Sequence, residues 1–117
     1  MSGTASINPP PEAWSGLQPG EQRVKSASLK PLLQAPDTLY VTPTVTIARQ
    51  DGAPMTASDM TVVGNPALDS TSLIVSAVLQ GGTLTPVDYA VTVGATGNQT
   101  GRPYFRTVYI STILALG

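Results

Sequence analysis

Residues 40–48 read YVTPTVTIA, and apolar and polar side chains alternate along this stretch. The alternation separates two faces: Val41, Pro43, Val45 and Ile47 on one, and Thr42, Thr44 and Thr46 on the other. A repeat of two residues is typical of a β-strand with one face on a core and one in solvent. The internal proline predicts an edge position or a β-bulge. This stretch therefore predicts a β-sheet protein.

Further strand signals follow at regular spacing, which predicts an all-β sandwich or barrel. The expected strands are residues 60–63, 72–79, 88–93 and 104–114. Residues 72–79 are almost continuously apolar, so we expect them to lie centrally in the core, with Gly81 and Gly82 ending that strand. Residues 94–101 are rich in glycine and threonine and are expected to form a turn. No ten-residue stretch shows the 3.6-residue period of an amphipathic helix.

The composition changes near residue 37, because residues 1–36 hold six of the eleven prolines. We expect an extended N-terminal arm over residues 1–36 and a β-sandwich domain over residues 37–117. A run of prolines favours a polyproline-like conformation over a helix. Trp14 either anchors the arm in a neighbouring subunit or packs on its own domain. The candidate partner-binding residues in the arm are Pro9, Pro10, Pro11 and Trp14.

The residue inventory excludes several kinds of chemistry. The sequence has no cysteine and no histidine, so disulfides, thiolate zinc sites and histidine-assisted nucleophiles are excluded. Charged residues make up 11% of the chain and the net charge is −1, and the six basic residues do not cluster, which argues against nucleic-acid binding. No apolar run is long enough to span a bilayer and the start lacks a signal-peptide pattern. We expect a chain without a cofactor or metal that has no membrane partner.

Paired carboxylates are the main catalytic device that remains, and five aspartates fall at expected strand ends or loops: Asp37, Asp51, Asp59, Asp69 and Asp88. Their spacing singles out no pair. Aspartate is common in turns because its side chain accepts local backbone hydrogen bonds. We therefore expect turn residues and no enzyme.

The glycines near residue 100 are expected to shape a hairpin, since the strand, loop and helix of a phosphate-binding loop are missing. A guanidinium after a tight turn can clamp carbonyls or a carboxylate, here Asp88, across the hairpin. The candidate structural turn residues are Gly81, Gly82, Asp88, Gly101 and Arg102.

Several of these elements occur together in an order that resembles the phage fibre-tail adaptor family. The resemblance lies in Gly81-Gly82, the strand Asp88–Val93, Thr96, Thr100-Gly101-Arg102 and the strand Thr107–Ser111, preceded by Lys30-Pro31, Pro36-Asp37 and Tyr40. It covers about residues 30–113. Pro86 stands where the family pattern has a glycine, and residues 1–29 have no counterpart in it. The resemblance implies an immunoglobulin-like sandwich that works in virion assembly.

We therefore expect a bacteriophage virion structural protein, an adaptor that docks through its N-terminal arm and links fibre, tail or connector components to the particle. Its expected partners are other virion proteins and copies of itself, as in a trimer, and it is assembled in the host cytoplasm. Two alternatives stay open. One is a capsid decoration protein that cements the shell from outside, and the other is a carbohydrate-binding β-sandwich module.

Overall fold

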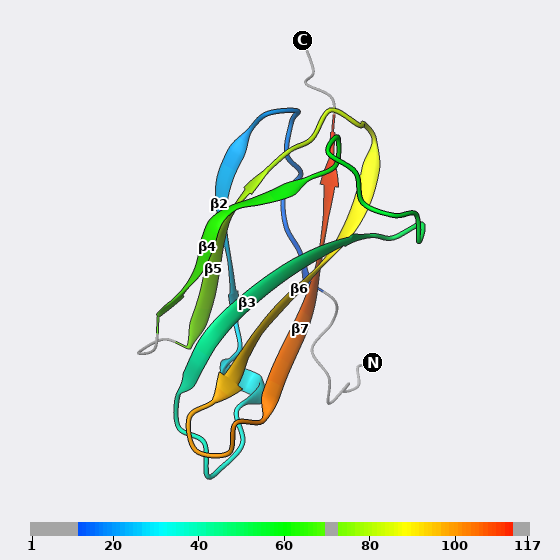
Figure 1. Ribbon diagram of the computed structural model, residues 1–117. Coiled ribbons are helices and arrows are strands. Elements are labelled where there is room, and N and C mark those ends of the chain that lie inside the picture. The colour runs from blue at the N-terminus through cyan, green and yellow to red at the C-terminus, as the bar shows by residue number, and fades with distance from the viewer. Residues whose placement is uncertain (1–11, 70–72, 114–117) are drawn as a thin grey trace, which may run out of the picture.

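A computed structural model describes residues 12–69 and 73–113, which form two packed β-sheets (Figure 1). The strands are β1 (Glu12–Ala13), β2 (Gln22–Ser28), β3 (Tyr40–Arg49), β4 (Thr61–Asp69), β5 (Ile74–Gln80), β6 (Val87–Gly97) and β7 (Pro103–Thr112). One sheet has the order β1-β7-β6-β3 and the other β2-β5-β4. All pairs are antiparallel except β1 with β7. The expected all-β sandwich is confirmed.

The core lies between the sheets and follows the two-residue period of the strands. Along β6, the side chains of Tyr89, Val91 and Val93 are buried and share one face, as expected. In β5 the alternate positions Val75 and Leu79 meet them from the opposite sheet. Burying each such side chain contributes roughly 1.5–3 kcal/mol. The part of the chain that the structure describes contains no helix long and apolar enough to cross a membrane.

Strand β3 is an edge strand, which confirms what its proline predicts. Its pairing with β6 shifts between Val41 and Thr44, and Thr42 has a φ of +54°. This bulge changes the face of the residues before it, so Tyr40 is buried and Val41 is 45% exposed. The expectation that Val41 faces the core is therefore wrong, and the alternation holds from residue 43 onwards.

The sequence predicts the place of the central strand correctly, but it predicts the ends of two other strands too early. Strand β5 lies between β2 and β4, which confirms its expected central place. Strand β4 runs to Asp69, well beyond residue 63, because a register shift absorbs residues 64–66 within the strand. Strand β6 continues to Gly97, so the hairpin turn is shorter than residues 94–101.

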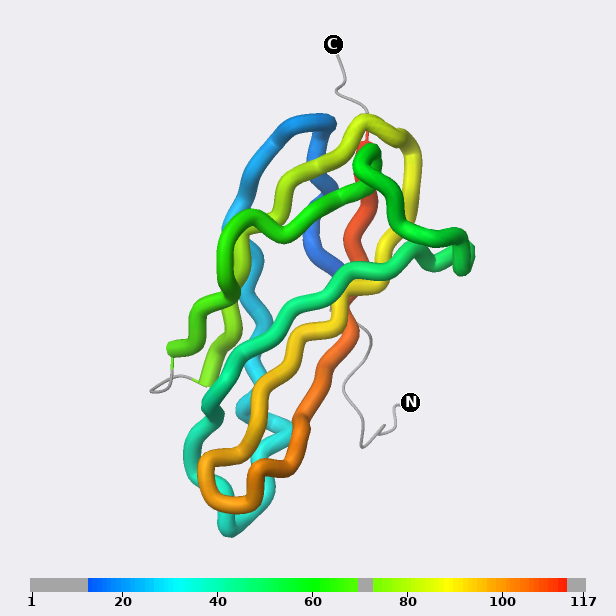
Figure 2. The backbone as a smooth tube through the Cα atoms, viewed as in Figure 1, coloured from blue at the N-terminus to red at the C-terminus, as the bar shows by residue number. Residues whose placement is uncertain are grey.

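The boundary expected at residue 37 is wrong for the described residues before it. Strand β2 pairs along its whole length with β5, and β1 pairs with β7. Leu17 and Leu29 are fully buried in the core. Figure 2 shows this blue-to-cyan segment passing from the edge of one sheet to the edge of the other. Residues 12–36 are therefore part of the sandwich, because its three-stranded sheet lacks an edge strand without β2.

Candidate functional site

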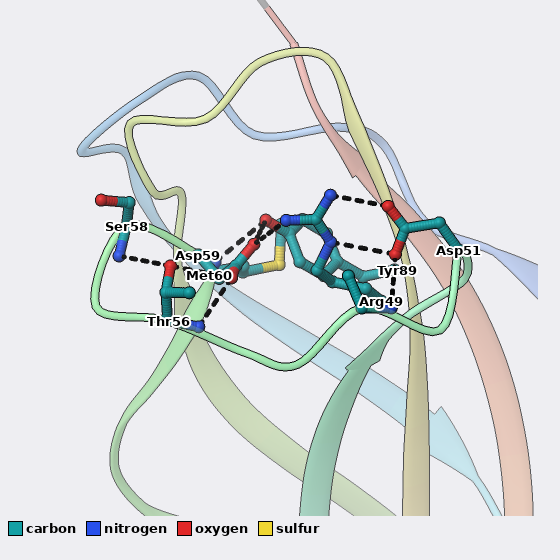
Figure 3. Close-up of polar contacts among 8 residues, drawn as sticks. Arg49, Asp51, Thr56, Ser58, Asp59, Met60 and Tyr89 are labelled. Atoms are coloured by element: carbon teal, nitrogen blue, oxygen red, sulfur yellow. Dashed lines mark hydrogen bonds and ion pairs between the residues drawn. The ribbon is translucent and has the colours of Figure 1, made fainter.

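A polar cluster closes one end of the sandwich (Figure 3). We call it the Arg49 cluster, and its members are Arg49, Asp51, Thr56, Asp59 and Tyr89. They come from the end of β3, the following loop and the start of β6. The end of β3 and the loop after it thus meet the start of β6, which is distant in sequence, through side-chain contacts.

Asp59 is the centre of this cluster, and its side chain is fully buried. One carboxylate oxygen accepts the Tyr89 hydroxyl at 2.7 Å and lies 3.6 Å from a guanidinium nitrogen of Arg49. The other accepts the backbone N–H and the hydroxyl of Thr56, at 2.8 and 3.1 Å. The Tyr89 oxygen also accepts the backbone N–H of Met60 at 3.3 Å. Both carboxylate oxygens are therefore used in holding the loop.

The guanidinium of Arg49 makes its hydrogen bonds mainly to Asp51. Its Nη2 and Nε donate to the two carboxylate oxygens of Asp51 at 2.6 and 3.1 Å, a bidentate arrangement. Asp51 also accepts the backbone N–H of Ala53 at 2.9 Å, which is the turn role expected of it. This hydrogen bonding raises the pKa of Arg49 and lowers the pKa of Asp51.

The ionised form of Asp59 is favoured in spite of its burial. Burial is the largest single influence and raises the pKa of this carboxyl. The hydrogen bonds from Tyr89 and Thr56 and the nearby Arg49 lower the pKa, and together they outweigh burial, so the net pKa is below normal. Burial, and then the bond to Asp59, raises the pKa of Tyr89. Asp59 is thus a buried anion held by donors, unlike a general acid, which needs a raised pKa.

A hollow of about 340 Å³ opens beside this cluster, lined by Arg49, Gln50, Asp51, Pro86, Val87 and Asp88. Its charged groups already have partners within the chain, since Asp88 accepts the hydroxyl of Ser111. Among the described residues, no group of three or more acidic side chains is arranged to hold a metal ion. The hollow therefore offers little to fix a ligand.

A second buried carboxylate closes the opposite end, where β6 leads into β7. Asp37 is 4% exposed, and Oδ1 accepts the backbone N–H groups of Gln99 and Thr100 at 2.8 and 2.9 Å. Its Oδ2 accepts the hydroxyls of Thr100 and Tyr104 at 2.7 and 2.8 Å. We call these four residues the Asp37 cluster. It ties the segment before β3 to the β6–β7 hairpin.

These hydrogen bonds dominate the electrostatics of Asp37. Burial raises the pKa of the carboxyl, but the bonds from Thr100, Gln99 and Tyr104 outweigh it and bring the pKa to about 2. The ring of Tyr40 packs edge-on against that of Tyr104, with centroids 5.3 Å apart. Burial, followed by the neighbouring Tyr104 and Asp37, raises the pKa of Tyr40 to about 12.

Gly97 allows this close approach. A Cβ atom on Gly97 would lie 2.1 Å from Oδ2 of Asp37, so no other residue fits without movement. Asn98 adds a second tie, because its side-chain oxygen accepts the backbone N–H groups of Thr38 and Leu39. The sequence does not predict these bonds of Asn98. Its one indication that the two segments meet is that Asp37 and Thr100 both match the adaptor pattern.

The expected turn residues fall at different ends of the molecule. Gly101 has a φ of +70°, which confirms the expected tight turn. Arg102 donates to the side-chain oxygen of Gln34 at 2.9 Å and does not clamp Asp88, which lies near the other end of β6. The expectation of an Arg102–Asp88 contact is therefore wrong, because β6 is longer than the sequence predicts.

Gly81 and Gly82 end β5, as expected, and they do so by close backbone contact. A Cβ atom on Gly81 would lie 2.2 Å from the carbonyl oxygen of Gln18, and one on Gly82 would lie 2.1 Å from that of Ser58. The pair thus lets two loops cross the strand end. Neither glycine has a positive φ.

Trp14 packs on its own domain. Its ring lies against the core, its Nε1 donates to the carbonyl of Ser26 at 3.1 Å, and its backbone N–H donates to Tyr109. The expectation of Trp14 as a free anchor for a neighbour is corrected, because the indole bonds to β2 and the backbone of the same residue bonds to β7. Pro9, Pro10 and Pro11 lie outside the described residues.

The outward faces of both sheets are features that sequence reasoning missed. On β6 and β7 the outward side chains are small, hydroxylated or aromatic: Ala90, Thr92, Gly94, Thr96, Pro103, Phe105, Thr107, Tyr109 and Ser111. Among the described outward positions of all strands, the charged ones are Asp69 and Asp88, each near a strand end. The low charge of the chain indicates that weakly charged surfaces exist, but only the strand register shows that they are the outward faces of the sheets.

Comparisons of the chain with protein-family models, curated proteins and solved structures find no match. The relation to the phage adaptors therefore remains a hypothesis that depends on the residues quoted for it.

Proposed function

We propose that this chain is a structural protein of a bacteriophage virion, an adaptor that links fibre, tail or connector components to the particle. The observation that carries the proposal is the pair of sheet faces with almost no charge. Charged residues normally make up about a quarter of the residues of a domain and help to keep it apart from its neighbours. A domain that has hydroxyl and apolar groups on both faces is suited to lasting contact with other proteins.

The strand order supports an immunoglobulin-like identity for the sandwich. Immunoglobulin domains pair strands B, E and D in one sheet and strands C, F and G in the other. If β2 to β7 are named B to G, the sheets β2-β5-β4 and β7-β6-β3 have these same pairings. This arrangement is the one that the resemblance to the phage adaptors implies.

The Asp37 cluster gives the resemblance a physical basis. The lead-in element Pro36-Asp37 and the turn Thr100-Gly101 belong to the adaptor pattern, and they are more than sixty residues apart in sequence. Their direct hydrogen bonding makes the pattern a structural unit that fixes one end of the sandwich. Neither this cluster nor the Arg49 cluster leaves a carboxylate free for catalysis.

Particle composition tests the proposal. Phage particles purified from cells that produce the chain are expected to contain it after a density gradient, as detected by peptide mass spectrometry. Its absence from purified particles would overturn the proposal. The number of copies per particle separates the two virion roles, because an adaptor is present in few copies and a capsid decoration protein in many.

A carbohydrate-binding module is the second candidate, and one observation favours it. Phe105 and Tyr109 are 59% and 37% exposed on the same face of β7, with Thr107 between them. Phe105 lies over Gly94, where a Cβ atom would come within 2.6 Å of its ring. Exposed aromatic rings can stack on sugars. Binding on a glycan array that is lost in the Phe105→Ala variant would support this candidate over the virion role.

A further inference from the structure

The outward face of the β2-β5-β4 sheet is arranged in rows of like residues. The register between β2 and β5 pairs Gln22 with Gln80, Val24 with Val78 and Ser26 with Ser76. On the other side of β5, Val63 of β4 pairs with Val78. We call Val24, Val78 and Val63 the valine row. It crosses all three strands and lies between a glutamine pair and a serine pair.

The polar pairs beside the valine row bond within the face. Gln22 Nε2 donates to Gln80 Oε1 at 3.0 Å, and the hydroxyls of Ser26 and Ser76 are 2.8 Å apart. A polar group that keeps its hydrogen bond costs less free energy to desolvate when a partner covers it. The face can therefore be covered by an apolar surface at lower cost than its composition indicates.

The two outer valines of the row are exposed to water, and Val78 between them is partly buried. Val24 is 66% exposed, more than any other large apolar side chain among the described residues, and Val63 is 37% exposed. Covering apolar surface is favourable by about 25 cal/mol per Å². Asp69, at the end of β4, is the charged residue of this face within the described residues.

We propose that this face is a contact between two copies of the chain, related by a two-fold axis beside Val78. Such a contact sets one surface against itself, so a charged surface repels its copy, whereas this face sets valine against valine. A strongly charged partner finds no complement here. The inference rests on the proposed function in one respect, namely that an assembly protein uses its uncharged faces for contacts between proteins.

The size of the face sets the strength of the contact. Seven residues at a rise of ~3.3 Å and three strands ~4.8 Å apart give the face a flat footprint of roughly 300 Å² per copy, which is smaller than the side-chain surface that it carries. A stable interface needs about 800 Å² per partner. The isolated dimer is therefore weak and forms at high protein concentration, and neighbouring contacts in a particle strengthen it through a high local concentration.

Sedimentation velocity on the purified chain tests the inference. From about 10 µM to on the order of 1 mM, a range suited to weak interfaces, the mean mass of the native chain is expected to rise from 12.1 kDa towards twice that value. The Val24→Lys variant places a charge inside the apolar contact on each copy and should stay at the monomer mass. The matched control is Thr107→Lys, which also changes an exposed strand position but on the other sheet, and which should associate like the native chain.

Dilution in a ¹H–¹⁵N NMR experiment locates the contact independently, with shifts expected at residues 24, 76 and 78 and not along β7. A native chain that remains monomeric at the highest concentration overturns the inference. If both lysine variants lose association equally, or only Thr107→Lys loses it, the contact lies elsewhere and the inference is also overturned. A monomeric chain that is found in particles refutes this contact alone, whereas a dimer absent from particles refutes the proposed function alone.

Discussion

Asp37 and Asp59 are buried acids in a chain that has little charge, and each supports one end of the sandwich. Each carboxylate accepts hydrogen bonds on both oxygens, from backbone N–H groups and from a tyrosine of the sheet. A buried ionised group is tolerated only when donors replace its water. The donors here come from distant parts of the sequence, so each acid stabilises loop against sheet.

The Tyr89→Phe variant tests this role at the Arg49 cluster. It removes the hydroxyl that donates to Asp59 and leaves the ring in the core, so it is expected to lower the free energy of unfolding by about 1 to 3 kcal/mol. Urea denaturation followed by circular dichroism measures the change. Tyr109→Phe removes a hydroxyl from an exposed ring and should change stability by less than about 0.5 kcal/mol. Equal effects in the two variants would contradict a structural role for the Asp59 contact.

At the level of elements, the sequence predicts strands best where apolar and polar residues alternate or where a short run is almost entirely apolar. The alternation in β3 and the apolar run of β5 identify these strands and their places in the sheets. Strand β4 is predicted too short because its bulge contains a glycine and a proline, which normally end strands. The sequence predicts an extended segment where β2 lies but assigns it to the arm, because its outward side chains are mixed and lysine and arginine occupy alternate positions.

The two polar clusters could be predicted only in part. Aspartates at strand ends are expected to accept backbone hydrogen bonds, and Asp37, Asp51 and Asp59 do so. Their partners depend on the length of β6 and on the pairing of its hairpin, which the sequence does not define. For this reason Arg102 contacts Gln34 and not an aspartate.

Two truncations test the corrected boundary of the domain. A chain that lacks residues 1–11 should fold, because it keeps both sheets and all of the buried core residues that the structure describes. A chain that lacks residues 1–36 loses β2, Leu17 and Leu29, and is expected to be unfolded or aggregated. Circular dichroism and NMR line widths distinguish the outcomes, and a folded 37–117 fragment would contradict the role of β2.

The stability of the whole molecule should depend on pH in acid, because carboxylates hold both ends. The pKa of Asp37 is about 2 in the folded chain and near 3.8 when unperturbed, and the pKa of Asp59 is also lowered. A lowered folded-state pKa gives stability that is full above about pH 4 and is lost as the pH falls through 2. The chain has no histidine, so little change is expected between about pH 5 and 8.

Thermal melting from pH 7 to pH 2 measures this dependence. The melting temperature of the Asp37→Asn variant is expected to be about 4 to 8 °C lower than that of the native chain at pH 7. Between pH 4 and 2 its melting temperature should fall by less than that of the native chain. The control Asp88→Asn changes an exposed carboxylate, and the amide oxygen can keep the hydrogen bond from Ser111, so this variant should melt like the native chain at pH 7. An Asp37→Asn chain with an unchanged acid transition would contradict the assignment.

The parallel pairing of β1 with β7 has a mechanical consequence. The backbone bonds from Trp14 to Tyr109, from Leu17 to Ser111 and from Ile113 to Leu17 join these segments side by side. When tension pulls residue 12 and residue 113 apart, the two segments slide along each other in opposite directions. Such shear loads the three bonds together, whereas peeling would break them one after another. The geometry gives the sandwich resistance to stretching along the line that joins its first and last strands.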